Sequence, residues 1–81
     1  MNTRRLELGD RNMIGKRVTE KRKEHKMTQA ELLAKLQLEG VSISSPALSL
    51  LEGQKRPVSD FELNALANIF DVTSDWFLGR E

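Results

Sequence analysis

The side chains that could do chemistry in this 81-residue chain are a single histidine, several closely spaced carboxylates and two basic stretches. His25 has neither cysteines nor clustered carboxylates beside it, so metal binding or catalysis by this residue is not expected. Asp60 with Glu62, and Asp71 with Asp75, resemble paired catalytic carboxylates. They fall in the first turns or flanks of expected helices, where acidic groups complement the helix dipole, so capping is the better interpretation. The sequence therefore predicts no enzyme, no metal site and no cofactor.

The basic side chains are concentrated at the start of the chain. Residues 1–26 hold nine Lys or Arg residues against four acidic residues, whereas residues 27–81 hold four against eight. This asymmetry indicates one face that binds a polyanion such as a nucleic acid and a second face with a different role. An ordinary first helix with a charged, solvated surface would produce the same pattern.

Length and composition limit the class of protein. A chain of 81 residues with 38% hydrophobic and 31% charged residues is expected to form one globular domain. The absence of cysteine excludes disulfides and thiolate metal sites. No apolar run approaches the roughly 20 residues that span a bilayer, and the N-terminus lacks a signal-peptide pattern. We therefore expect a cytoplasmic protein with no membrane partner.

Helical periodicity predicts an all-α protein of five short helices around one core, with no strand. Residues 1–11 are expected to form a flexible N-terminal arm, although their leucines would also fit a short extra helix. The domain is expected over residues 12–81, with helices near 12–24, 28–39, 45–52, 59–70 and 74–78. Ser59 and Glu62 form a predicted capping box at the fourth helix, and Thr73 is the expected cap of the fifth.

The segment from residue 27 to residue 57 carries the most information. Thr28 and Glu31 form a predicted capping box, and Gly40 supplies a left-handed helix stop. The Ser-Ser-Pro run at 44–46 marks the next helix start. Two helices joined by a glycine-containing turn, and then a basic exit at 53–57, are how small proteins present one helix to the major groove of DNA.

Three ordered segments, IGKRVTEKRKEHKMTQAEL, ISSPALSLLEGQKRP and LNALANIFDVTSDWFLG, resemble the Cro/phage-repressor (XRE) type of helix-turn-helix domain. They cover about residues 13–79. The resemblance implies a lambda-repressor-like fold and sequence-specific binding of double-stranded DNA, with the third helix in the major groove. It also implies a transcriptional regulator, more specifically a repressor, that acts as a homodimer.

The same resemblance implies roles for individual residues. The expected contacts to the DNA backbone are Thr28, Gln29, Lys55 and Arg56. The expected recognition-helix surface comprises Ser44, Ser45, Pro46, Ala47, Ser49 and Leu50. Arg22 and Glu52 match a structural ion pair that ties the first helix to the end of the third.

Four features depart from the family pattern. The helix-turn-helix segment is about five residues longer than is usual in the family, and Leu33 stands where a small alanine is usual. Lys26 stands where glycine is usual, at a backbone position expected to have positive φ. The outward positions of the third helix include no Arg, Lys, Asn or Gln, the types that make bidentate contacts to guanine or adenine. Serine hydroxyls could still meet base edges, and Ala47 and Leu50 could meet thymine methyl groups. Shape readout and phosphate contacts would then contribute more.

An outward Leu50 fits a protein partner as well as a thymine methyl group. The alternative function is therefore a protein-interaction or antitoxin-like module on a repressor-like scaffold, with weak or no specific DNA binding. Its partner would bind through the third helix or the C-terminal helix. Trp76 and Phe77 are expected either to close the core or to line a dimer contact.

Overall fold

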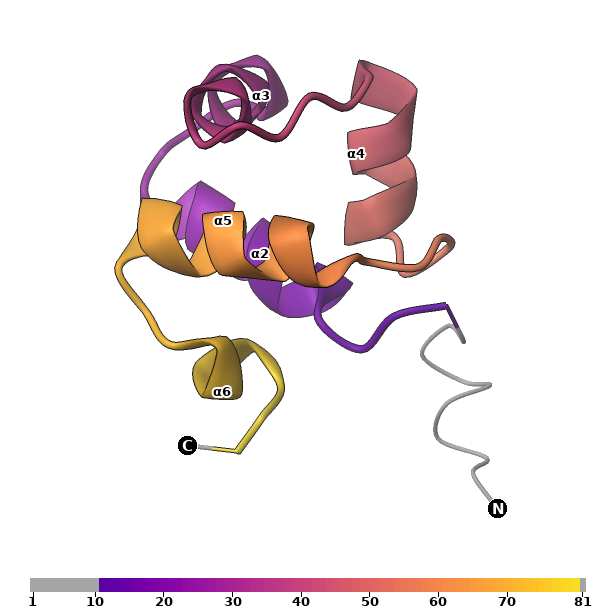
Figure 1. Ribbon diagram of the computed structural model, residues 1–81, viewed down its shortest axis with the longest axis vertical. Helices are drawn as coiled ribbons and strands as arrows, with labels where there is room; N and C mark the ends of the chain where they lie inside the picture. Colours follow the sequence, from indigo (N-terminus) through magenta and orange to yellow (C-terminus); the bar gives the residue numbers. More distant parts are fainter. Residues whose placement is uncertain (1–10, 81) are drawn as a thin grey trace.

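The computed structural model describes residues 11–80, and this part of the chain contains five α-helices and no β-strand (Figure 1). The helices are α2 (Gly15–Glu24), α3 (Gln29–Leu38), α4 (Ser45–Glu52), α5 (Asp60–Phe70) and α6 (Ser74–Phe77). The predicted all-α class is therefore confirmed. The arm expected at residues 1–11 lies, apart from its last residue, outside the described residues. None of the helices in the described part is long and apolar enough to cross a bilayer.

Four of these helices begin at a hydroxyl side chain that caps the first turn. Thr28 Oγ1 accepts a hydrogen bond from Glu31 N (3.1 Å), and Thr28 N donates to Glu31 Oε1 (2.8 Å), which confirms the predicted capping box. Ser59 and Glu62 form the same reciprocal pair at the start of α5. The remaining two caps are Ser44 on α4 and Thr73 on α6.

The turns between helices depend on a few residues with positive φ. Gly40 (φ 85°) occupies the left-handed position predicted for it after α3, and Gly79 (φ 76°) occupies a similar position after α6. Lys26 has φ 53°, so the expectation of positive φ before α3 is confirmed. In the turn after α4 the left-handed residue is not glycine. Gly53 has φ −84°, and Gln54 has the positive φ (61°).

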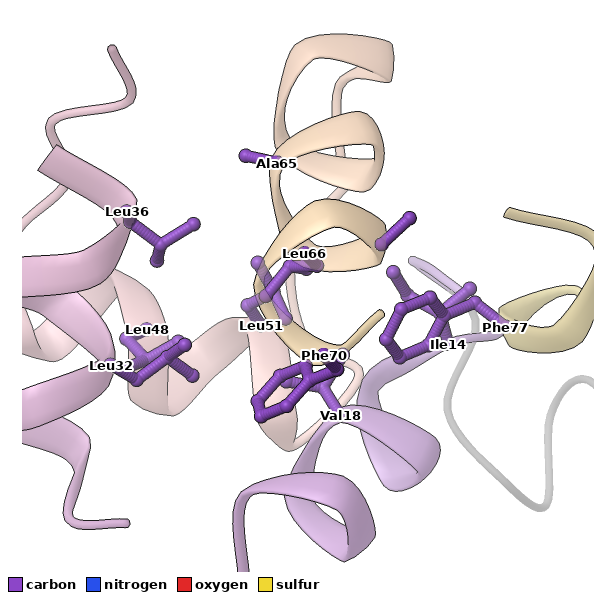
Figure 2. Close-up of a cluster of buried hydrophobic side chains, with 11 residues drawn as sticks. Ile14, Val18, Leu32, Leu36, Leu48, Leu51, Ala65, Leu66, Phe70 and Phe77 are labelled. Carbon is purple, nitrogen blue, oxygen red and sulfur yellow. The ribbon is translucent and has the colours of Figure 1, made fainter. Parts of the chain in front are cut away.

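One hydrophobic core receives side chains from all of these helices and from Ile14, just before α2 (Figure 2). Its members are Ile14, Val18, Leu32, Leu36, Leu48, Leu51, Ala65, Leu66, Ala67, Phe70 and Phe77. The apolar side chain of Phe61, in the first turn of α5, is instead 76% exposed.

The arrangement of the helices sets α3 and α4 apart from α6. In Figure 1 the pair lies on one side of α5 and α6 lies on the other. α4 packs against α2 and α3, α3 also packs against α5, and α5 packs against α6. The outer surface of the α3–α4 pair is therefore formed far from the C-terminal helix.

The C-terminal helix is attached to α2 through two cations. Phe77 is buried, with its ring 6.5 Å from that of Phe70. Trp76 is half-buried, and Arg17 Cζ and Lys21 Nζ lie 4.7 and 4.9 Å from its ring centroid. Arg17 Nη1 also donates to Trp76 O (2.7 Å). Phe77 therefore closes the core, and these cation–π contacts dock α6 on α2.

Candidate nucleic-acid interface

α4 buries one face and exposes the other. Leu48 and Leu51 point into the core, because residues three apart lie on the same side of a helix. The expected recognition-helix residues that are exposed are Ser44, Ser45, Pro46, Ser49 and Leu50, and Ala47 is half-buried. The surface that the sequence predicted to meet DNA is therefore open to solvent in the monomer.

Two residues of this surface have contrasting chemistry. Ser44 Oγ accepts the capping hydrogen bond from Ala47 N (3.2 Å), so this hydroxyl already has a structural task at the start of α4. Leu50 is 48% exposed and presents an aliphatic side chain among serines. The outer surface of α4 therefore combines hydroxyl groups with apolar side chains, of which Leu50 is the largest.

Arg22 and Glu52, the expected structural ion pair, lie in direct contact. Arg22 Nε donates to Glu52 Oε2 (2.7 Å) and Arg22 Nη2 donates to Glu52 Oε1 (3.1 Å), a bidentate arrangement. The third guanidinium nitrogen donates to Met27 O (3.0 Å). One arginine of α2 therefore fixes both the end of α4 and the turn that leads into α3.

Gln29, an expected phosphate contact, is joined to this ion pair. Its Nε2 donates to Glu52 Oε1 (3.0 Å), and its Oε1 accepts from Ser49 Oγ (3.3 Å). Gln29 is the first residue of α3, where backbone N–H groups lack partners within the helix. The structure thus brings an amide at the start of α3 together with a hydroxyl on the outer face of α4.

Lys55 and Arg56, the two basic residues expected to contact phosphates, are placed differently. Lys55 is exposed. Arg56 Nη1 and Nη2 donate to the two carboxylate oxygens of Glu62 (3.2 and 2.8 Å), and Nη1 also donates to Pro57 O (2.9 Å). Arg56 is therefore used to hold the basic exit against α5, a role that the sequence interpretation missed.

Glu62 has two tasks that share one carboxylate. Burial by itself would raise the pKa of Glu62, but hydrogen bonds from Arg56 and Ser59 outweigh that effect and lower the pKa below its ordinary value. The same carboxylate raises the pKa of Arg56. The capping-box pattern predicted that Glu62 caps the start of α5. Its ion pair with Arg56 could not be predicted in this way, because it depends on how the loop between α4 and α5 folds back.

Asn12 is a further positioning residue that the sequence interpretation missed, because it was assigned only as the approximate start of the first helix. That helix begins at Gly15. Asn12 Oδ1 accepts from the two N–H groups that precede and open the helix (3.0 and 2.8 Å). Its Nδ2 donates to Leu51 O (3.1 Å) and Arg56 O (2.8 Å). Asparagine before a helix is a recognisable cap signal, but its reach to the far end of α4 is not.

Comparisons of the chain with protein-family models, with curated proteins and with solved structures found no match. The chemistry of the site therefore follows from its own side chains. The start of α3 offers an amide and first-turn N–H groups, the outer face of α4 offers hydroxyls and an aliphatic group, and the exit carries the exposed Lys55. These groups are hydrogen-bond donors, acceptors and one cation.

Proposed function

We propose that the protein binds double-stranded DNA with α4 in the major groove and regulates transcription, as a homodimeric repressor of the Cro/phage-repressor type. The hydrogen bond from Ser49 on α4 to Gln29 on α3 is the observation that carries this proposal. Through this hydrogen bond Gln29, whose amide is suited to contact a phosphate, lies beside the outer face of α4, which is suited to contact base edges. A major groove about 12 Å wide admits an α-helix.

The contacts in this proposal fall into two classes. Gln29, Lys55 and the capped N-terminus at Thr28 meet phosphates, while Arg56 contributes less because Glu62 already holds its guanidinium. Serine hydroxyls and Leu50 meet the bases. Bidentate base contacts are absent from the outer face of α4, so discrimination between sequences is modest. Binding should weaken steeply as salt rises, because phosphate contacts release counterions.

Fluorescence anisotropy of the full chain against a pool of random and genomic duplexes tests the proposal across a range of salt concentrations. The double variant Gln29→Ala with Lys55→Ala should bind all sequences more weakly. Its logarithmic salt slope should be shallower by about one for each phosphate that the variant no longer neutralises. Arg80→Ala is the control for charge, since Arg80 follows α6, the helix that lies on the other side of α5 from the α3–α4 pair. Absence of salt-sensitive binding at micromolar protein would defeat the proposal.

The dimeric part of the proposal has a separate test. Two copies would place their α4 helices about 34 Å apart on successive major grooves of a two-fold-related site. Sedimentation of the protein–DNA complex should therefore give two protein chains per duplex. A complex with one chain per duplex at saturation would exclude the homodimer while leaving DNA binding intact.

The exposed Leu50 also supports a second candidate, a protein-interaction or antitoxin-like module. In that case a stoichiometric protein partner should be recovered from cell extract, and Leu50→Glu should abolish its capture. Ser45→Ala, also on the exposed face of α4, should leave the capture unchanged. If Leu50→Glu keeps every protein association, this candidate fails.

A further inference from the structure

We propose that Ser49 is a specificity-determining residue that accepts a hydrogen bond from an exocyclic amino group of a base, adenine N6 or cytosine N4. This inference rests on the proposed DNA binding and adds a rule for the bases. It follows from where each proton lies along the contacts from Arg22 to Glu52, then to Gln29 and Ser49.

The carboxylate of Glu52 fixes the orientation of the Gln29 amide. Glu52 receives two hydrogen bonds from Arg22, and both oxygens of a carboxylate act only as acceptors. The Gln29 atom that contacts Glu52 must therefore be the amide nitrogen, which is how the amide is placed (3.0 Å). The amide oxygen consequently faces Ser49.

The orientation of the Gln29 amide then fixes the proton of Ser49. An amide oxygen only accepts, and a serine hydroxyl has a single proton to donate. Ser49 Oγ lies 3.3 Å from Gln29 Oε1, so the hydroxyl proton is directed at Gln29. What Ser49 presents to its surroundings is an oxygen with lone pairs. Because Ser49 is exposed on the outer face of α4, those lone pairs are available to a ligand.

An outward acceptor distinguishes between base edges in the major groove. Adenine N6 and cytosine N4 carry amino groups that donate, whereas thymine O4 and guanine O6 only accept. Ser49 therefore favours the amino-bearing bases and disfavours the carbonyl-bearing ones. A free serine hydroxyl would suit either kind, so Gln29 acts here as a positioning residue for the Ser49 proton.

The test begins with selection of bound duplexes from a random library by the full chain, followed by removal of single amino groups from the enriched site. Purine replaces one adenine, or 2-pyrimidinone replaces one cytosine, at each position in turn. At one position in each half-site, the loss of the amino group should weaken wild-type binding roughly 2- to 10-fold, the range for a single hydrogen bond. Weaker binding with purine identifies adenine as the base that Ser49 contacts, and weaker binding with 2-pyrimidinone identifies cytosine.

Three variants make the test specific. Ser49→Ala should be insensitive to the amino group at that position, whereas the control Ser45→Ala should keep the wild-type sensitivity. Gln29→Met should bind all duplexes more weakly and should also lose most of the preference for the amino-bearing base, because the Ser49 proton is released. Ser49 is exposed, so the Ser49→Ala comparison decides the question even if Gln29→Met binds too weakly to measure.

Failure of this inference is distinguishable from failure of the proposed function. If the wild-type chain binds salt-sensitively and selects a site, but amino-group removal affects wild type and Ser49→Ala equally at every position, only the role of Ser49 is overturned. Retention of the full base preference by Gln29→Met overturns the positioning role of Gln29. If no duplex is bound or enriched at all, the proposed function itself is wrong.

Discussion

Lys55 and Arg56 are neighbours of the same charge, yet only Arg56 is held by a carboxylate. Arg56 donates two hydrogen bonds to Glu62, which is buried, whereas Lys55 is exposed. A planar guanidinium matches both oxygens of a carboxylate, and the pair binds the loop between α4 and α5 to the first turn of α5. At the scale of single residues, contact with the buried Glu62 gives Arg56 a structural role, whereas Lys55 stays exposed to solvent.

Arg56→Met should destabilise the protein because it leaves the buried Glu62 carboxylate without its main partner. The expected loss is about 1–3 kcal/mol in the free energy of unfolding, the cost of an unsatisfied buried polar group. Urea denaturation measures it. Lys55→Met is the matched control, in the same loop and with the same loss of charge, and should change stability by no more than about 0.5 kcal/mol. Equal effects of the two variants would contradict the structural role of Arg56.

Glu62 should contribute to the pH dependence of stability. Its pKa is lowered in the folded protein, so the ionised carboxylate stabilises the fold above the ordinary pKa of glutamate. That contribution is lost as the pH falls through the lowered value. Glu62→Gln should therefore be less stable than wild type at pH 7, and its stability should fall less between pH 7 and acid. Urea midpoints measured at pH 7, 5 and 3 provide the comparison, and parallel curves for the two proteins would contradict it.

At the scale of elements, the join between α2 and α4 positions the proposed interface. Asn12 binds the start of α2 to the end of α4 and to the basic exit. Gly15 allows this approach, because a Cβ on it would overlap Leu51 O and lie 2.8 Å from Glu52 O. Both neighbours are backbone atoms and cannot rotate away. The ion pair of Arg22 and Glu52 then fixes the same two helices about two turns further along α2.

Gly15→Ala should destabilise the protein, although alanine is the better helix former by about 1 kcal/mol. The added methyl group would force α2 away from α4, and overpacking of this kind costs about 1–3 kcal/mol. Thermal and urea unfolding measure the difference. Gly53→Ala is the control, because Gly53 has an ordinary φ of −84° and the nearest atom to its Cβ would lie at 3.3 Å. Stabilisation by Gly15→Ala would show that the two helices are not held in contact here.

At the scale of the whole molecule, the helices of the described part share one core and not two. α5 supplies Ala65, Leu66, Ala67 and Phe70 to that core, and it packs against both α3 and α6. The α3–α4 pair and the C-terminal helix are consequently coupled through α5. Trp76 reports on the docking of α6, since it lies against Arg17 and Lys21 of α2 and is the only tryptophan in the chain.

Unfolding should therefore be a single cooperative transition. Urea titrations followed by far-ultraviolet circular dichroism, which reports on all helices, and by Trp76 fluorescence, which reports on α6, should have coincident midpoints. Arg17→Met removes one of the two cations on the Trp76 ring and the hydrogen bond to Trp76 O, and it should lower both midpoints together. Separate midpoints in the wild-type protein would mean that α6 undocks independently of the rest.

The sequence by itself determined the helices, because their signals act over a few residues. A capping box spans four residues, as from Thr28 to Glu31, and the spacing of Leu48 and Leu51 places both on one side of α4. The predicted capping box is confirmed, and Leu48 and Leu51 are both buried. The all-α class followed from such local patterns. The exposure of Phe61 did not, because the hydrophobicity of a residue does not by itself show whether it packs in the core.

Only the tertiary structure decided how the candidate interface is held together. Asn12 contacts a carbonyl 39 residues away, and Ser49 donates to an amide 20 residues away. Which donor meets which acceptor over such separations depends on the packing of several helices at once, since each side chain has alternative partners until the backbone is placed. The same holds for Arg56, whose basic charge suggested a DNA contact. Its partner, Glu62, becomes reachable only when the loop after α4 returns to α5.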